Sequence, residues 1–259
     1  MLNLSFSLTE LEYFLLIVAR TAGFVASAPF FSNTATPRTV KVGFTVLLSV
    51  LLYNVLPVSA VEYSTVFMYA VIVVKESLTG LLIGYGANIC SSILNFAGHM
   101  VDMETGLSMV TLYDPMTREN TTITGSFYQY TITLMLFISG LYQYILMALK
   151  ESFSLIPING AIFKSDALLA SMLEFLTDYI SIGFTICLPI FCCILLLNCI
   201  LGILAKVSPN MNMFAVGIQL KILCGLTVML ITVGMLPDVS RMILSETQKV
   251  VTMFIGGMT

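Results

Sequence analysis

Long runs without a charged residue constrain this chain more than any other feature of its sequence. Four such runs lie between charged side chains, at residues 42–61, 77–98, 120–149 and 179–205. Each is at least as long as the roughly 20 apolar residues that an α-helix needs to cross about 30 Å of hydrocarbon. Because lipid offers no hydrogen bonds to backbone amides, a helix is the structure in which such runs can cross a bilayer. The runs therefore predict membrane helices.

Two further apolar stretches carry one internal cation each. Arg20 interrupts residues 13–31, and Lys221 interrupts residues 211–237. With these two stretches the sequence predicts about six long helices. The predicted fold class is all-α, in a polytopic membrane protein whose residues 1–259 form a single domain.

The composition excludes several other classes of protein. Hydrophobic residues make up 58% of the chain and charged residues 10%, whereas soluble domains carry about 25% charged residues. The formal net charge is −3, and the basic residues are dispersed along the chain. Binding to nucleic acid requires a concentrated basic patch instead. We therefore expect the chain to contact membrane lipid and no nucleic acid.

The sequence contains no recognisable set of residues for catalysis or for holding a metal. The single histidine and the six cysteines lack the spacing of a metal site, and all the cysteines lie in apolar runs. There is no phosphate-binding loop, no dinucleotide-binding glycine pattern and no nucleophile elbow. We therefore predict no catalytic residue, no metal site and no cofactor, and the chain is not expected to be an enzyme.

One side of the third predicted helix carries a regular series of polar side chains. The series consists of Asn88, Ser92, Asn95, His99 and Asp102. Its steps of four, three, four and three residues place the side chains on one face of a helix. Two interpretations are open: polar contacts between packed helices, or, for the half from Asn95 to Asp102, contact with water in a pore. The series is thus a candidate pore-facing or partner-facing surface.

A pair of glycines precedes the polar series. Gly80 and Gly84 have the G-x-x-x-G spacing, and Ala87 and Ser91 continue the same edge with small side chains. Small residues let two helix backbones approach closely inside a membrane. We therefore predict that Gly80 and Gly84 pack against a second helix.

The segment after the polar series breaks the helical pattern. Residues 103–119 mix glycine, proline and charges with bulky apolar side chains, and the Asp-Pro pair within them favours a turn. A loop with this many apolar side chains should not be exposed to water. It packs either into its own helix bundle or into the mouth of a channel as a plug, a role that adaptable methionine side chains suit. The candidate plug residues are Gly106, Leu107, Met109, Leu112, Tyr113, Asp114 and Pro115.

Prolines in the C-terminal half set expectations for the helices around them. Pro209 should end the preceding helix near Ser208, because the residue before a proline avoids the helical conformation. Either Asn210 or Asn212 could then cap the next helix. Pro189 lies inside an apolar run, where we expect a kink rather than a break.

Several blocks of residues resemble one family in order and at near-constant spacing. The N-terminal blocks are Arg20-Thr-Ala-Gly-Phe, Ala28-Pro-Phe-Phe-Ser and Pro37-Arg-Thr-Val-Lys-Val-Gly-Phe44. The central block includes Gly98, Asp102, Gly106-Leu-Ser108 and Asp114-Pro115. The C-terminal block contains Leu197-Asn198, Gly202, Lys206 and Pro209-Asn-Met-Asn-Met-Phe214. On these residues the chain resembles the FliR family of flagellar biosynthesis proteins, the R/T subunits of the type III export gate.

The resemblance implies a structural, pore-forming component of the flagellar type III protein export gate. Its expected location is the bacterial inner membrane, at the flagellar basal body. In this family one R subunit joins P-type and Q-type subunits around a secretion pore, and the B-type switch subunit is a further expected partner. The resemblance implies that the long helices are partly kinked and arranged as hairpins. The expected substrates are unfolded flagellar proteins. The resemblance also implies that a middle loop, here about residues 106–120, helps to plug the pore.

Two alternative functions stay open on the sequence. One is an injectisome export-apparatus subunit of the same family, and the other is a self-contained transporter of small solutes. Transporters commonly consist of related repeats with discontinuous helices at the binding site. The sequence shows no internal repeat, and charges within its apolar runs are sparse. Purification separates an export-gate subunit from a transporter, since a gate subunit is expected to carry two different partner chains, whereas a transporter is expected as a monomer or homodimer.

Overall fold

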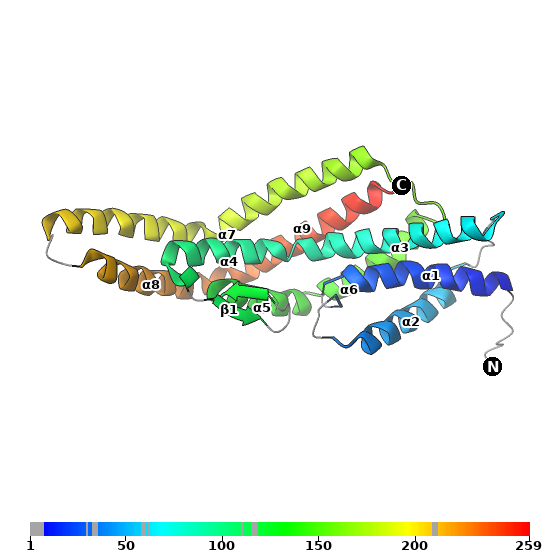
Figure 1. Ribbon diagram of the computed structural model, residues 1–259, viewed down its shortest axis with the longest axis horizontal. Coiled ribbons are helices and arrows are strands. Elements are labelled where there is room, and N and C mark those ends of the chain that lie inside the picture. The colour runs from blue at the N-terminus through cyan, green and yellow to red at the C-terminus, as the bar shows by residue number, and fades with distance from the viewer. Residues whose placement is uncertain are drawn as a thin grey trace. The chain divides into compact units, whose positions relative to one another are not determined.

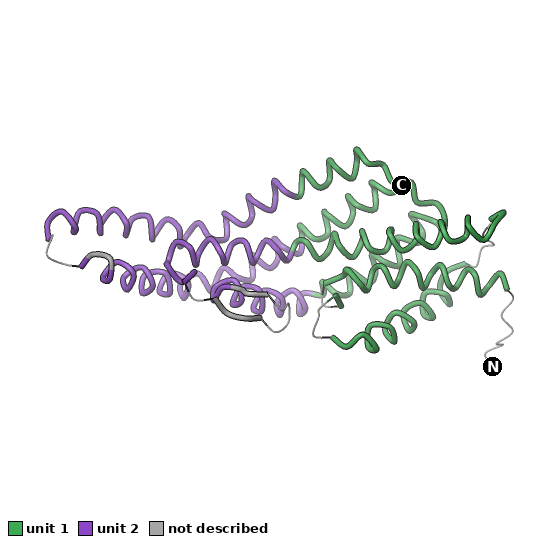
Figure 2. The backbone as a smooth tube through the Cα atoms, in the orientation of Figure 1, with its two compact units in different colours: residues 1–90, 140–175, 245–259 green, residues 91–139, 176–244 purple. Residues whose placement is uncertain are grey.

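The computed structural model of the protein describes residues 8–29, 31–32, 36–57, 61, 63–109, 111–114, 119–208 and 212–259. This part of the chain is mostly helical and includes one two-stranded sheet (Figure 1). The chain divides into two compact units, each assembled from segments far apart in the sequence (Figure 2). Unit 1 comprises Met1–Cys90, Gly140–Phe175 and Ser245–Thr259, and unit 2 comprises Ser91–Ser139 and Leu176–Leu244.

The elements follow the apolar segments of the sequence. The first are α1 Leu8–Ser27, α2 Arg38–Val55, α3 Val66–Ile89, α4 Ser92–Thr105, the 3-10 turn η1 Leu107–Met109, β1 Thr111–Asp114 and β2 Glu119–Thr122. They are followed by α5 Ile123–Ile138, α6 Leu141–Leu155, α7 Ser165–Val207, α8 Met213–Thr232, the short 3-10 helix η2 Val233–Met235 and α9 Leu236–Gly256. Thr65, Thr122 and Asn212 cap α3, α5 and α8 by accepting backbone N–H bonds.

The core of unit 1 is built around the contact between α1 and α3. A Cβ atom added at Gly80 of α3 would collide with the backbone oxygen of Arg20, and one at Gly23 of α1 would collide with that of Ser77. The helices approach this closely because glycine leaves room for the facing backbone. Gly84, one turn further on, lies against Phe24 and Ser27 of α1. Helix α2 packs on α1, and α6 contacts α3.

Unit 2 is built around α4 and α5. A Cβ atom at Gly98 of α4 would collide with the backbone of Gly125 in α5, so these two helices also meet at glycine. The ring of Phe96 in α4 lies 5.2 Å from the ring of Tyr179 and 5.9 Å from that of Phe184, both in α7. Such aromatic contacts bury large apolar surfaces. Helix α8 packs on α4 as well.

Several helical segments are long and apolar enough to cross a membrane. Within the described residues these are Arg38–Val55, Val66–Thr105, Ser165–Val207 and Ala215–Gly256. The pair α5 and α6 would make a fifth span, although it is bent by 65°. Helix α1 is not in this set, and it carries Glu10, Glu12 and Arg20. Length and composition thus fit a polytopic membrane protein.

The all-α class predicted from the sequence is confirmed, while several helices differ from the expectation. The apolar run 120–149 is divided at Gly140, where a φ of 82° ends one helix and starts the next. Helix α7 begins at Ser165, well before the apolar run 179–205. Helix α9 was not predicted, because its charged residues hide an amphipathic pattern whose apolar members include Ile243, Val250 and Phe254.

Helix α7 contains Pro189 and ends shortly before Pro209 in the sequence. Helix α7 continues through Pro189, so the run is not broken there, as predicted. It ends at Val207, next to the predicted end at Ser208. Asn212 caps α8 by accepting a 3.4 Å hydrogen bond from the backbone N–H of Ala215, and Asn210 lies outside the described residues.

Candidate functional site

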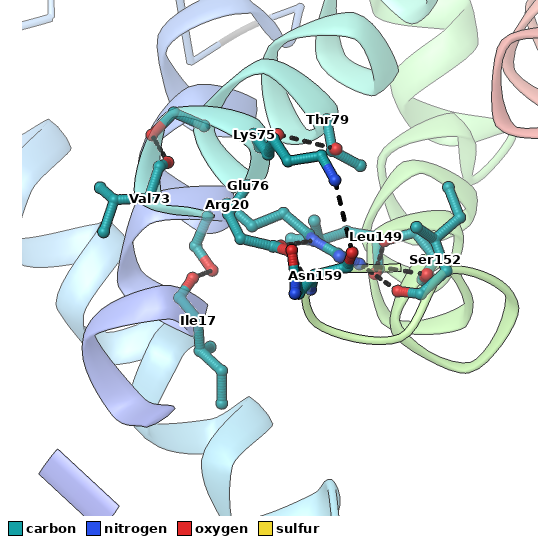
Figure 3. A network of polar contacts seen from close by, with 12 residues as sticks. Ile17, Arg20, Val73, Lys75, Glu76, Thr79, Leu149, Ser152 and Asn159 are labelled. Carbon is teal, nitrogen blue, oxygen red and sulfur yellow. Dashed lines mark hydrogen bonds and ion pairs between the residues drawn. The ribbon is translucent and has the colours of Figure 1, made fainter. Parts of the chain in front are cut away.

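Two fully buried charges pair in unit 1. Arg20 of α1 and Glu76 of α3 are both 0% exposed, and Nε of Arg20 lies 2.6 Å from Oε2 of Glu76 (Figure 3). The glycine contact positions them, because Gly80 is one helical turn after Glu76 and packs on the backbone of Arg20. A buried charge is costly unless it is paired and hydrogen-bonded. Each of the two buried charges is therefore stabilised by the other.

The end of α6 and the turn after it complete this network. Nη1 of Arg20 donates to the backbone oxygens of Ser152 and Ile156, at 3.1 and 2.9 Å. Oε1 of Glu76 accepts a 2.9 Å hydrogen bond from the backbone N–H of Asn159. Because a cation complements the negative end of a helix, Arg20 both neutralises Glu76 and caps α6. The network fastens the end of α6 to α1 and α3.

Asn159 holds the turn in an unusual backbone conformation. Its φ of 67° lies in the left-handed region, which asparagine tolerates better than most residues. Its backbone oxygen also lies 3.5 Å from Nζ of Lys75, the residue before Glu76 (Figure 3). The ring of Phe153 covers Arg20, with its centroid 4.3 Å from Cζ of Arg20. Side chains of α1 and α3 therefore fix the position of the turn.

Sequence reasoning missed the role of this pair. In the sequence, Arg20 interrupts an apolar stretch and begins one block of the family resemblance, and Glu76 is the residue before the run 77–98. The available signal is that charges inside apolar segments usually pair with one another. Their opposite signs could have suggested that α1 and α3 are neighbours. The carbonyl partners on α6 leave no signal in the sequence.

Asp102, the last member of the predicted polar series, links α4 to α5 in unit 2. It is fully buried, and its carboxylate accepts hydrogen bonds from Oγ1 of Thr124 and, at 2.9 Å, from the backbone N–H of Thr124. Thr124 lies in the first turn of α5, where free N–H groups and the helix dipole favour a carboxylate. In the structure Asp102 thus contacts α5 within the same chain.

The other members of the polar series are divided between the two units. Asn88 belongs to α3 in unit 1 and is half-buried, whereas Ser92, Asn95 and His99 belong to α4 in unit 2. A turn at Cys90 and Ser91 separates α3 from α4. Ser92 and His99 are exposed and Asn95 is half-buried, so the structure brings these three together on one accessible side of α4.

The candidate plug segment is more ordered than the sequence pattern indicates. Gly106 ends α4 with a φ of 85°, and Leu107 and Met109 lie in the 3-10 turn η1, where Met109 is 76% exposed. The strand β1 contains Leu112, Tyr113 and Asp114 and pairs antiparallel with β2. Pro115 lies outside the described residues. The described part of the segment therefore contains two antiparallel strands between α4 and α5.

In the part of the chain that the structure describes, no group of three or more His, Cys, Asp or Glu side chains is arranged to hold a metal ion. The cysteines are free thiols, with Cys90 and Cys187 buried and Cys192 and Cys199 exposed. Among the described residues, the fully buried charged ones are Arg20, Glu76 and Asp102, and they form the two internal contacts described above.

Comparison with known proteins places these features in a family. Residues 11–247 match the family described as "Bacterial export proteins, family 1". The chain is 25% identical to the flagellar biosynthetic protein FliR of Bacillus subtilis, over 90% of this chain and 91% of that protein. It is 25% identical to the FliR protein of Aquifex aeolicus, over 86% and 85%, and 24% identical to that of Escherichia coli, over 81% and 80%. The chain belongs to the bacterial export proteins of family 1.

Proposed function

We propose that this chain is a structural, pore-forming subunit of the flagellar type III protein export gate. The family match over residues 11–247 carries the proposal, because it spans both units and every candidate residue. Three similar proteins are flagellar biosynthetic proteins by name, which favours the flagellum over the injectisome. The long apolar helices support a location in the bacterial inner membrane, at the flagellar basal body.

In this proposal the chain acts together with other subunits of the export gate. The expected partners are P-type and Q-type subunits, together with the B-type switch subunit. Exposed apolar side chains along unit 2 support an assembled state, and they include Leu188, Leu196 and Ile203 of α7 and Leu223, Leu230 and Ile231 of α8. Apolar surface of this extent requires cover by protein or lipid.

The proposed mechanism is a passive, gated conduit. Unfolded flagellar proteins pass through a pore that this chain helps to line, and energy comes from the membrane gradient and from an ATPase elsewhere in the apparatus. Ser92, Asn95 and His99 supply an accessible polar surface on α4 for pore water or a partner helix. The hairpin around residues 106–120 obstructs the lumen until a substrate arrives.

Removing this chain from its bacterium is expected to abolish secretion of flagellar axial proteins, because the pore cannot be completed without it. Immunoblots of the culture medium measure the effect, and a plasmid copy of the gene should restore secretion. Secretion at the parental level in the deletion strain would show that the proposed function is wrong. Loss of injectisome secretion, with flagellar secretion intact, would instead establish the alternative member of the family.

Shortening the candidate plug is expected to make the closed gate leak. Deletion of residues 107–113 removes η1 and most of β1, so the lumen loses its proposed obstruction. The measurement is ion leakage in cells that express no secretion substrate. Met109→Ser offers a milder variant, and Met103→Ser is its matched control, since Met103 is an exposed methionine on α4. Unchanged leakage in the deletion variant, at normal membrane levels of the chain, would refute the plug.

A further inference from the structure

The two ends of the candidate plug segment lie close together in unit 2. Helix α4 ends at Thr105, and β2 ends at Thr122, directly before α5. Asp102, in the last turn of α4, accepts hydrogen bonds from the hydroxyl of Thr124 and, at 2.9 Å, from its backbone N–H. Asp102 is 0% exposed and Thr124 is 1% exposed. Their contact therefore closes the base of the segment that lies between them in the sequence.

Asp102 differs from Glu76, the fully buried carboxylate of unit 1, in how its charge is balanced. Glu76 pairs with Arg20, whereas none of the ion pairs between residues that the structure describes includes Asp102. Burying a lone charge is costly, and here the donors and the positive end of the dipole of α5 offset that cost. Because these donors lie in the first turn of α5, the charge specifies which part of α5 faces the end of α4.

Helix α4 is also anchored to two other helices of unit 2. A Cβ atom added at Gly225 of α8 would collide with Cγ2 of Thr105. A Cβ atom at Gly183 of α7 would collide with the ring of Phe96, whose centroid lies 5.2 Å from that of Tyr179. These contacts do not involve α5. Helix α4 therefore offers a support against which Asp102 can hold the first turn of α5.

The first turn of α5 in turn determines where the strands lie. Thr122 is the last residue of β2 and also the cap of α5. Its side chain accepts a 3.3 Å hydrogen bond from the backbone N–H of Gly125, and its backbone oxygen accepts one from Oγ of Ser126 at 2.9 Å. Strand β2 lies next to α4 and pairs with β1. A shift of the first turn of α5 away from α4 would therefore move both strands.

From these contacts we propose that Asp102 is the latch of the candidate plug, because its hydrogen bonds to Thr124 hold the two strands in the position that closes the pore. Asp102 is a positioning residue, since it acts through α5 and the strands. This inference rests on the proposed function, because a latch requires that residues 106–120 obstruct a pore. It adds to that function a residue that keeps the gate closed.

Two threonines that flank the segment provide matched variants. Thr124→Val removes the hydroxyl that donates to the Asp102 carboxylate. Thr105→Val removes an equally buried hydroxyl, which donates to backbone oxygens within α4. Each replacement exchanges a hydroxyl for a methyl group of similar size, but only Thr124→Val weakens the link between α4 and α5. Asp102→Asn is a second latch variant, which keeps the shape of the side chain and removes its charge.

In the full chain, in its native membrane, Thr124→Val and Asp102→Asn should each raise ion leakage through the closed gate. The expected increase is about tenfold, the factor that corresponds to losing one hydrogen bond to a charged group. Thr105→Val and Thr124→Ser should leak no more than the parent, because both keep the hydroxyl at position 124. Leakage is measured in cells that express no secretion substrate. Flagellar secretion should persist in each variant, which a general loss of folding would not permit.

Parental leakage in both latch variants, at normal membrane levels of the chain, would overturn the inference, and so would equal leakage in Thr105→Val. If Asp102→Asn does not accumulate, Thr124→Val decides, since its backbone N–H still donates to Asp102. Deletion of residues 107–113 separates the latch from the plug: a leaking deletion beside tight latch variants keeps the plug and removes the latch, whereas a tight deletion refutes both. The export function is tested separately, by secretion in the strain that lacks the chain.

Discussion

Replacing Gly80 with alanine is expected to destabilise unit 1 severely. The added Cβ would collide with the backbone oxygen of Arg20 and would lie 2.8 Å from the carbonyl carbon of the same residue and 3.0 Å from the backbone nitrogen of Phe24. Backbone atoms cannot rotate away as a flexible side chain can, so α1 and α3 must separate. Overpacking of this kind costs about 1–3 kcal/mol, and it also pulls Arg20 away from Glu76. Thermal unfolding of the purified complex in mild detergent measures the loss.

Gly43→Ala is the matched control for Gly80→Ala. Gly43 also lies inside a helix, but a Cβ atom there would meet nothing within 4 Å. Since alanine is a better helix former than glycine by about 1 kcal/mol, the unfolding temperature should stay level or rise. An unfolding temperature for Gly80→Ala equal to that of the parent would contradict the close packing of α1 on α3.

Breaking the buried ion pair is expected to have the largest effect of any single substitution considered. Glu76→Leu leaves the Arg20 guanidinium buried without its counter-charge, and loss of one partner from a buried pair costs about 3–5 kcal/mol. Arg20→Met has a comparable effect, because it leaves Glu76 unpaired and removes the donor to the carbonyls of Ser152 and Ile156. Both variants should accumulate poorly in membranes and unfold at lower temperature.

The double variant tests whether the pair itself causes these losses. Combining Arg20→Met with Glu76→Leu removes both charges, so the double variant should be more stable than the sum of the single losses predicts. Recovery stays incomplete, because the backbone N–H of Asn159 loses its acceptor. Asp238→Asn is the control, since Asp238 and Arg241 form an exposed pair at 3.7 Å that should contribute at most about 1 kcal/mol. Strictly additive losses in the double variant would show that the two charges act independently.

The helical segments could be predicted because charge-free runs of membrane length have one structural solution. The bend at Gly140 could not be predicted, because no charged residue interrupts the run 120–149 and a glycine alone does not end a helix. The same limit applies to α9, where Asp238, Arg241 and Lys249 obscure an apolar face that a search for helical period would have found. Composition thus predicts where the apolar helices lie. It does not predict where a helix changes direction, and it misses a helix that is amphipathic.

The candidate site was predictable only where it follows helical spacing. Ser92, Asn95 and His99 share a side of α4 because steps of three and four residues ensure it. The contact of Asp102 with Thr124 could not be predicted, because the sequence between them lacks a helical period and no local pattern shows where the chain returns. Arg20 and Glu76 also come from separate helices, and spacing within one helix says nothing about which helices are neighbours.

The pairing of β1 with β2 determines how the proposed plug can move. Partners run from Thr111 opposite Thr122 to Asp114 opposite Glu119, so these strands satisfy one another's backbone groups. The paired strands can move together without breaking the hydrogen bonds between them. Gly106, whose φ is 85° and whose surroundings are open, offers a pivot before the first strand, whereas Thr122 ties the second strand to the cap of α5. If these residues plug the pore as proposed, opening must turn both strands together about these two ends or separate them.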